Sequence, residues 1–419
     1  MVDLVVGKLN RFPDNTLEIL KVLACLGNSA EAAVLSMVHG RAEEEIHSDL
    51  REAIRGGFVV QLAGSYNFVH DRVEEAAYSL IPEELRAEVH LRIGRLLMAR
   101  LPADEIAKNI FYVVNQLNRG VALVSDSNEK EHVVELNLCA GKKAKASSAY
   151  ATACSYLSVA MTLLGHEYWK DRYDLAFGLW LERAECEFLS GNFDEAETLI
   201  SELLVRSSSR SDKAAAYCLR IDLHVMKSEE PRAVACALEC LRLFGIEMSA
   251  HPSSEQVQVE YENVWRNVGE RSIQSLIDLP PMGDTEMQAA MRVLSVFYGP
   301  AYTVDNNLFY LCVCHMVNIS LKYGITDASA HGLALFGRIL GPLHGLYRDG
   351  YLFGKLGVEL VEKNEFIAYR AKVYFTTALA AVWTQPVSTV IELLRAALRA
   401  GEATLCTGPT PTINWSRIS

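Results

Sequence analysis

The residues most able to take part in binding or catalysis are His70 and Asp71, in the stretch NFVHDRVEEAAYSLI (residues 67–81). They stand between a short apolar run and a segment whose apolar residues have helical spacing. An imidazole at this place could cap a surface helix, act as a general base, or sense a bound phosphate by donating a hydrogen bond to it. The carboxylate of Asp71 could cap the helix, because it can accept from the free N–H groups of the first turn. The residue types alone leave these roles open.

Other catalytic motifs are absent from the sequence. Residues 141–143 (GKK) open no G-x-x-x-x-G-K loop, so the chain alone cannot hydrolyse ATP by the common P-loop route. The H-E-x-x-H and G-x-S-x-G patterns of zinc proteases and hydrolases are missing too. Cys312, Cys314 and His315 are of metal-ligand type, but their spacing in an apolar helical run favours a packed helix face. His331 and His344 are interpreted as structural. We expect no activity, metal or cofactor in this chain alone.

Length and composition narrow the class of protein further. At 419 residues the chain exceeds one ordinary core, so several domains or a repeat array are expected. Forty basic and 52 acidic side chains give a net charge of -12, which disfavours nucleic acid as a partner. Ten cysteines without regular spacing fit a reducing, cytoplasmic location. No apolar run reaches the roughly 18 residues of a membrane span.

The first hundred residues have the element order of a winged-helix module. Apolar periodicity predicts helices at residues 16–27, 30–39 and 42–55, and residues 58–69 (FVVQLAGSYNFV) predict a β-hairpin around Ala63 and Gly64. A DNA-reading third helix needs basic and amide side chains. The third helix here instead begins with Glu43, Glu44 and Glu45, which favours a regulatory or protein-binding role over DNA binding.

The remainder predicts a tetratricopeptide-like helical repeat. Ala184, Leu189, Gly191, Phe193 and Ala196 occupy the small, apolar, glycine, aromatic and alanine positions of such helix pairs. Weaker echoes occur at residues 149–164 and 229–245, and Phe193 and Ala196 are predicted to be buried between consecutive helices. Further helices are expected at residues 307–323, 328–340, 351–363 and 368–382. The predicted fold class is therefore all-α, with a winged-helix module at 1–100, a repeat solenoid at 101–400 and an irregular tail at 401–419.

Longer stretches resemble one known family. FVHDRVEEAAYSLIPEELRAEVHLRIGRLL (residues 68–97) and FYVVNQLNRG (residues 111–120) are similar to the segment that follows the nucleotide-binding domain in large bacterial signalling kinases. In that family a serine/threonine kinase, a STAND-type AAA ATPase and the sensor histidine kinase of a two-component system share one chain. The resemblance covers about residues 4–400 and continues through LERAECEFLSGNFDEAE, DASAHGLALFGRILGP and GYLFGKLGVELVEK.

The resemblance implies a role for the opening motif. Val69, His70 and Asp71 match a Met-His-Asp type motif, with Val in place of Met, whose histidine points at the phosphates of bound ADP. His70 and Asp71 are thereby expected to sense the nucleotide. The ADP or ATP itself would belong to the ATPase domain of a parent protein. The kinase, P-loop and histidine kinase domains are missing here, so we expect this chain to be a fragment.

Two functions follow as hypotheses. The first is a non-catalytic regulatory and partner-sensing segment of an ATPase-coupled serine/threonine and histidine kinase. Its partners would be the ATPase and kinase domains of the parent, and a protein or small-molecule signal on the helical array. The alternative is a free-standing helical-repeat scaffold for protein–protein interactions.

Overall fold

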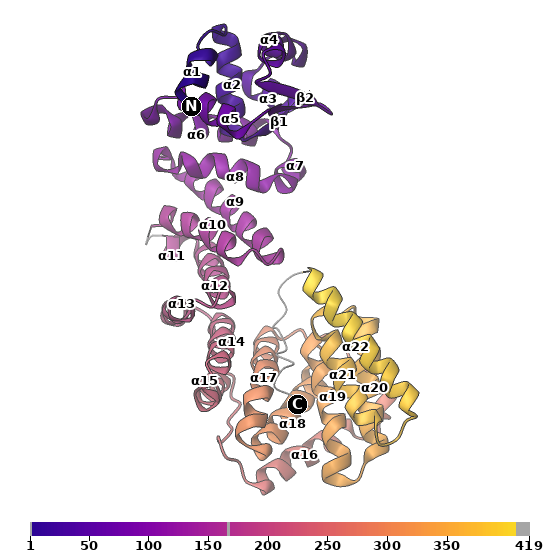
Figure 1. Cartoon of the computed structure of the whole chain (residues 1–419). Coiled ribbons are helices and arrows are strands. Elements are labelled where there is room, and N and C mark those ends of the chain that lie inside the picture. The colour runs from indigo at the N-terminus through magenta and orange to yellow at the C-terminus, as the bar shows by residue number, and fades with distance from the viewer. Residues whose placement is uncertain (1, 166–167, 408–419) are drawn as a thin grey trace. The chain divides into compact units, whose positions relative to one another are not determined.

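The computed structural model describes residues 2–165 and 168–407, and helices dominate it (Figure 1). This confirms the predicted all-α fold class. The chain divides into two compact units: unit 1 comprises Met1–Lys143 and Ser155–Lys170, and unit 2 comprises Ala144–Cys154 and Asp171–Ser419. The domain boundaries expected at residues 100 and 400 remain predictions. Within the described ranges, no helix is both long and apolar enough to cross a bilayer.

Unit 1 contains most of the elements in the first part of the chain; α9 to α11 contribute residues to both units. Its helices are α1 (Val2–Leu9), α2 (Asp14–Leu26), α3 (Ala32–His39), α4 (Glu43–Arg55), α5 (Asp71–Ser79), α6 (Glu83–Arg100), α7 (Ala103–Lys108), α8 (Ile110–Arg119), the 3₁₀ turn η1 (Val121–Leu123), α9 (Ser127–Ala146), α10 (Tyr150–Leu163) and α11 (Tyr168–Asp171). The three helices predicted at 16–27, 30–39 and 42–55 are α2, α3 and α4.

A small antiparallel sheet follows α4. Its strands are β1 (Ser29–Glu31), β2 (Val59–Leu62) and β3 (Ser65–Phe68), in the order β1-β3-β2. The β2–β3 turn is tight because Ala63 and Gly64 both adopt left-handed φ angles, of 48° and 84°, as a type I′ hairpin turn requires. The predicted hairpin is thus confirmed, whereas β1 was not predicted.

The core of unit 1 lies between the helices and the hairpin. Ile46, Leu50 and Ala53 follow one another at helical spacing on α4 and are fully buried. From the hairpin, Tyr66 and Phe68 alternate with exposed or half-buried neighbours and join the same core. The hairpin is therefore held to the helices by its apolar face, and this fixes the chain that leads from β3 into α5.

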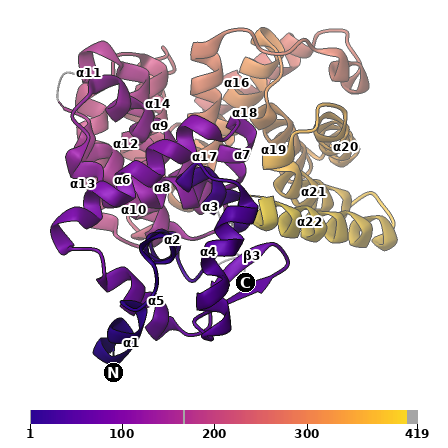
Figure 2. The same cartoon turned by 90° about the horizontal axis from the view of Figure 1, so that it is seen from above.

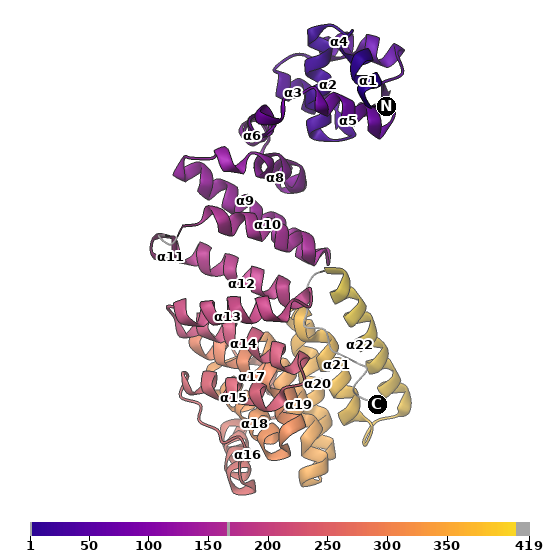
Figure 3. The same ribbon diagram turned by 60° about the vertical axis from the view of Figure 1, so that its left-hand side comes forward.

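Unit 2 consists of helices joined by short turns. They are α12 (Tyr173–Leu189), α13 (Phe193–Arg206), α14 (Arg210–Met226), α15 (Glu230–Arg242), α16 (Ser254–Val268), the 3₁₀ helix η2 (Ile273–Asp278), α17 (Thr285–Val304), α18 (Asn306–Tyr323), α19 (Asp327–His344), α20 (Tyr347–Lys363), α21 (Ile367–Ala381) and α22 (Val387–Thr407). Helices α12 to α15 lie side by side in sequence order (Figure 3). The four later helices predicted from the sequence correspond to α18 to α21.

The helix pair α12–α13 contains the residues of the predicted repeat motif, so its structure tests that prediction directly. Gly191 has a φ of 83° at the turn, which explains the glycine there. Ala196 is fully buried, as predicted. Phe193 is only half-buried, because it lies at the first position of α13 and its ring contacts Phe188 across the turn, with ring centroids 6.1 Å apart. Phe193 was predicted to be buried between consecutive helices, whereas it is only half-buried.

Helices α19 and α20 approach each other very closely through glycines. A Cβ atom added to Gly337 would lie 2.3 Å from the carbonyl oxygen of Gly350, and one added to Gly350 would lie 2.5 Å from that of Gly337. Real Cβ atoms are excluded at such distances, so both positions need glycine. Helices α20 to α22 continue the unit next to α19 (Figure 2).

The last described helix extends past the expected end of the array. The irregular tail was predicted to begin at residue 401, but α22 continues to Thr407; residues 408–419 lie outside the described residues. Apolar side chains on α22 are exposed at helical spacing, at Val387, Ile391, Leu394 and Leu398. The helix therefore continues into the first residues of the stretch whose Thr, Gly and Pro content suggested irregular structure.

Candidate functional site

His70 is the N-cap residue of α5. Its backbone is extended, with φ -155° and ψ 142°, and its Nδ1 accepts a hydrogen bond of 3.1 Å from the backbone N–H of Arg72. The capping role expected of Asp71 is therefore filled by His70. In the neutral imidazole this bond places the ring proton on Nε2, since Nδ1 acts as the acceptor. The exposed side chain thus presents one N–H donor beyond the helix end.

Asp71 has a different environment from His70. It lines a hollow of about 420 Å³ together with Ala24, Glu74, Glu75, Tyr78 and Arg119. Burial raises the pKa of the Glu74 carboxyl, the charge of Asp71 raises it further, and Arg119 opposes both. The two predicted site residues are adjacent in sequence, but only His70 has its side chain at the cap, whereas Asp71 adds to an acidic patch on α5.

A buried polar network lies behind α5. His90 of α6 is 1% exposed and joins three helices through its ring nitrogens. Gln116 Nε2 donates to the carbonyl oxygen of Cys25 at 2.8 Å, so its Oε1 faces His90 Nδ1 at 2.7 Å. The imidazole therefore donates from Nδ1, and its Nε2 accepts from the Tyr78 hydroxyl at 3.0 Å. Arg119 Nη1 approaches the same Nε2 at 3.4 Å.

The network holds His90 in its neutral form. Burial lowers the pKa of His90, and the positive charges of Arg119 and Arg86 lower it further, against the opposing effect of the Gln116 hydrogen bond. A protonated ring would turn Nε2 into a donor facing the Arg119 guanidinium. The arrangement connects α5, through Tyr78, to α6 and α8. Sequence reasoning missed it because these residues are distant in sequence and belong to no motif.

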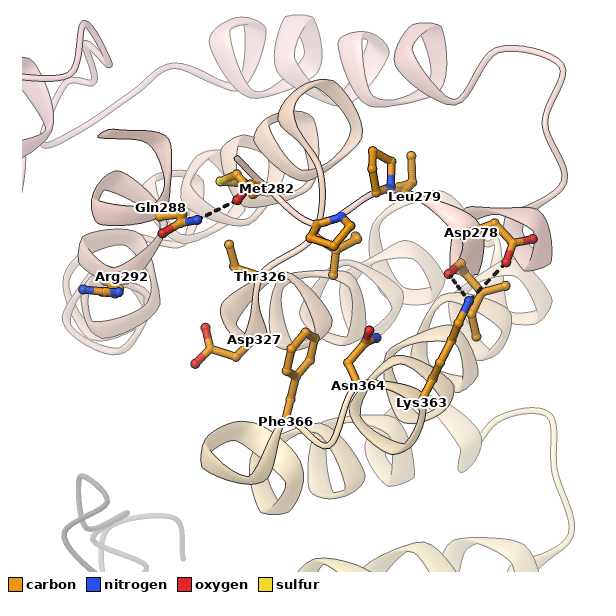
Figure 4. Close-up of a pocket in the computed structure, with 14 residues that line it drawn as sticks. Asp278, Leu279, Met282, Gln288, Arg292, Thr326, Asp327, Lys363, Asn364 and Phe366 are labelled. Carbon is orange, nitrogen blue, oxygen red and sulfur yellow. Dashed lines mark hydrogen bonds and ion pairs between the residues drawn. The ribbon is translucent and has the colours of Figure 1, made fainter. Parts of the chain in front are cut away.

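Unit 2 contains a larger pocket, of about 550 Å³ (Figure 4). Its floor includes the segment Leu279 to Met282, which makes a parallel bridge to the turn before α19: the Ile325 N–H donates to Pro280 O at 2.8 Å, and the Met282 N–H donates to Ile325 O at 3.0 Å. Other lining residues come from η2, α17, α19 and the α20–α21 turn. They are Asp278, Gln288, Arg292, Thr326, Asp327, Lys363, Asn364 and Phe366.

Several polar groups of this pocket are hydrogen-bonded to its own walls. Lys363 Nζ donates to Ile277 O and Asp278 Oδ1, both at 3.1 Å, and Gln288 Nε2 donates to Met282 O at 2.6 Å (Figure 4). The Thr326 hydroxyl caps α19.

The other residues singled out in the sequence are packed in helices. Cys312 and Cys314 are buried on α18, as the packed-face interpretation predicts, and burial raises the pKa of both thiols. His315 Nδ1 lies 4.0 Å from Glu260 Oε2, and His344 stacks on Tyr261 with ring centroids 3.8 Å apart. Among the described residues no group of three or more His, Cys, Asp or Glu side chains has the placement of a metal site.

Comparison with known proteins gives few matches. No family model matches the chain. The Hybrid signal transduction histidine kinase G of Dictyostelium discoideum is 24% identical over an aligned length of 340 residues, and the match covers 71% of this chain and 10% of that protein. The chain thus spans about a tenth of the length of this curated relative. A solved STAND protein with a tetratricopeptide repeat sensor, from Pyrococcus horikoshii, has 12% identity and a TM-score of 0.39, covering 94% of this chain and 58% of that one.

Proposed function

We propose that this chain is a non-catalytic regulatory and partner-sensing segment of a larger signalling protein. The similarity to a protein named as a signal transduction histidine kinase supports a signalling context. The family resemblance of the sequence adds an ATPase and a serine/threonine kinase as the parent's other domains, in a cytoplasmic setting. The observation that carries the proposal is the outward Nε2–H of His70 at the end of α5.

The proposed mechanism is a nucleotide-state latch. In the parent protein, His70 Nε2–H donates to the β-phosphate of ADP held by the ATPase domain, and Asp71 lies beside it as the first residue of α5. A signal bound on the helical array favours the state in which His70 has left the nucleotide. ADP then exchanges, and kinase output follows. The His90 network supports this route, because it connects α5 to two further helices of unit 1.

The test separates the latch from the helix cap. Replacing His70 with Ala removes both, and loss of an N-cap alone costs about 0.5–2 kcal/mol of stability. His70→Asn retains a strong capping residue but has no imidazole Nε2. In the full-length parent protein, His70→Asn should raise the ADP dissociation rate roughly ten- to a hundredfold, the worth of one charge-assisted hydrogen bond. In this chain alone it should leave the thermal unfolding midpoint unchanged.

The opposite pattern would reject the latch. If His70→Asn leaves the ADP dissociation rate of the parent unchanged while His70→Ala destabilises the chain, the imidazole is only a cap. The chain is then better described as a helical-repeat scaffold. A matched control is Asn67→Asp, on β3 three residues before His70, which should affect neither measurement.

A further inference from the structure

A group of polar side chains in unit 2 comes from four helices. Helices α14, α17, α19 and α21 pack as successive neighbours in that order. They contribute Asp222, Tyr298, His331, and Tyr369 with Lys372, respectively. The His331 ring lies edge-on to Tyr298, with centroids 4.9 Å apart, and 5.8 Å from Tyr369. Lys372 Nζ lies 5.4 Å from the centre of the Tyr369 ring. We call these five residues the interior cluster.

His331, Asp222 and Lys372 of the interior cluster lack the internal partners that buried polar groups normally have. His331 is 1% exposed, yet its Nδ1 has no hydrogen-bond partner among the described residues. Asp222 and Lys372 are half-buried, and within the described part of the chain neither makes a hydrogen bond or an ion pair. Most buried polar side-chain atoms in proteins are hydrogen-bonded, and each exception needs a reason. A ligand that supplies the missing partners is such a reason.

The electrostatics show that these groups share one environment of low polarity. Burial raises the pKa of Asp222 to about 6, against the opposing charge of Lys372. Burial also lowers the pKa of Lys372, and raises that of Tyr298 to about 12. Burial therefore disfavours the charged forms of both Asp222 and Lys372, while the charge of each favours the charge of the other. Perturbed groups of this kind are concentrated where proteins bind ligands.

The interior cluster and the pocket of Figure 4 both include residues of α17. The Ser295 hydroxyl donates to Arg292 O at 2.7 Å, so it accepts from the Tyr369 hydroxyl, also at 2.7 Å. Arg292 lines the pocket, and so does Phe366, one helical turn before Tyr369 on α21. Tyr369 of the interior cluster is thus bonded to α17, which contributes Gln288 and Arg292 to the pocket of about 550 Å³, but none of the five cluster residues lines that pocket.

We propose that the interior cluster binds a small ligand with an anionic group on an aromatic body. Lys372 would donate to the anionic group, and the His331 ring would add a donor once its proton is on Nδ1. The rings of Tyr298 and Tyr369 would contact the aromatic body. Asp222 would disfavour the anion while it is charged, which makes binding sensitive to pH. This inference rests on the sensing role proposed above and names its site and ligand class.

The pH dependence follows from the groups around Asp222. Its carboxyl interacts with Lys372 on α21 and with Glu185 on α12, and it raises the pKa of Tyr298 on α17 and of Cys218 on its own helix. Below the pKa of Asp222 of about 6 its negative charge is lost, so an anion is bound more tightly. Benzoate stays ionised well below that pH, so it reports this effect without titrating itself.

The experiment uses the purified chain and benzoate as the probe. Binding is measured by ligand-observed NMR at two pH values, on either side of the Asp222 pKa, with benzyl alcohol as the neutral analogue. We expect benzoate to bind more tightly at the lower pH and benzyl alcohol to show no binding. Lys372→Met should weaken benzoate binding at least about tenfold, because a charge-assisted hydrogen bond is lost. Asp222→Asn should bind benzoate tightly at both pH values.

The matched control is Lys355→Met, on the exposed side of α20, where Lys355 faces Glu359 at 3.6 Å. It should bind benzoate like the wild type. Equal binding by the Lys355 and Lys372 variants, benzyl alcohol binding as well as benzoate, or an absence of benzoate binding would each overturn the proposal. Circular dichroism verifies that each variant is folded. Because this assay involves no ADP, it can fail while the His70 latch holds, or succeed while the latch fails.

Discussion

Two histidines, one in each unit, are buried to the same extent and have opposite surroundings. His90 in unit 1 and His331 in unit 2 are both 1% exposed. The ring of His90 has partners on both nitrogens, in Gln116, Tyr78 and Arg119. Nδ1 of His331 has none among the described residues, and its neighbours are tyrosine rings. A buried histidine with partners on both nitrogens is compatible with a stable core, whereas an unsatisfied one costs stability, and for His331 we propose ligand binding as the reason.

The largest expected effect is a loss of stability in unit 2. The close packing of α19 and α20 can offset the cost of the unsatisfied His331, and a substitution at their contact disrupts that packing. Gly337→Ala places a Cβ atom 2.3 Å from the carbonyl oxygen of Gly350, which cannot move without shifting α20. We expect unfolding free energy to fall by about 3 kcal/mol. Gly178→Ala on α12 is the control, because a Cβ atom there meets nothing within 4 Å. Urea unfolding should show no loss for Gly178→Ala; equal losses would show that the glycines are not needed for packing.

The comparison of the two histidines is tested by the same substitution in each. His90→Leu leaves Gln116 Oε1 and the Tyr78 hydroxyl without their partner, so we expect a loss of about 2 kcal/mol. His331→Leu removes an unsatisfied nitrogen and should change stability by less than about 1 kcal/mol in either direction. Thermal and urea unfolding measure both. A larger loss for His331→Leu than for His90→Leu would reverse the assignment of structural and binding roles.

A smaller effect is expected at the repeat turn. Phe193 is half-buried, so Phe193→Ala should cost about 1–2 kcal/mol, less than the loss expected for a fully buried phenylalanine. Val205→Ala, at a side chain 85% exposed on the same helix, should change stability by less than about 0.5 kcal/mol. Urea unfolding distinguishes the two. A cost for Phe193→Ala as small as that for Val205→Ala would show that the Phe188 contact contributes nothing.

The smallest effect is a pH dependence of unit 1. The pKa of His90 is lower in the folded chain than its ordinary value of 6.5, so the unfolded chain binds more protons near and below that pH. Stability is therefore complete above about pH 6.5 and is lost as the pH falls toward the folded pKa. Each unit of pKa difference is worth about 1.4 kcal/mol. His90→Leu should have a shallower decline on acidification in urea unfolding; an unchanged slope would exclude His90 as the titrating group.

The sequence was informative where local signals determine structure. The left-handed pair Ala63 and Gly64 marks the hairpin, and apolar spacing gives α2 to α4 and α18 to α21. It missed β1, because Ser29 to Glu31 contains no β-branched or aromatic residue and forms a strand only by pairing with β3, far along the chain. The Thr, Gly and Pro content of residues 401–419 also suggested irregular structure from residue 401, whereas α22 continues to Thr407.

The candidate sites could be predicted only in part. His70 was identified by its place before a helix, and of the two residues considered as possible caps, His70 and Asp71, it is His70 that caps α5. The His90 network and the interior cluster were not predictable, because each joins residues from three or four helices that tertiary packing alone brings together. His331 had been interpreted as structural. Its lack of a partner is visible only when the surrounding side chains of α17 and α21 are placed.

The parallel bridge at the floor of the pocket has a consequence for hydrogen exchange. Ile325 donates to Pro280 O and accepts from the Met282 N–H, so the loop before α17 and the turn before α19 open together or not at all. Amides of loops ordinarily exchange with solvent through small local openings. The amides of Met282 and Ile325 should instead be protected like those of a core helix, and they should exchange only when α17 and α19 separate.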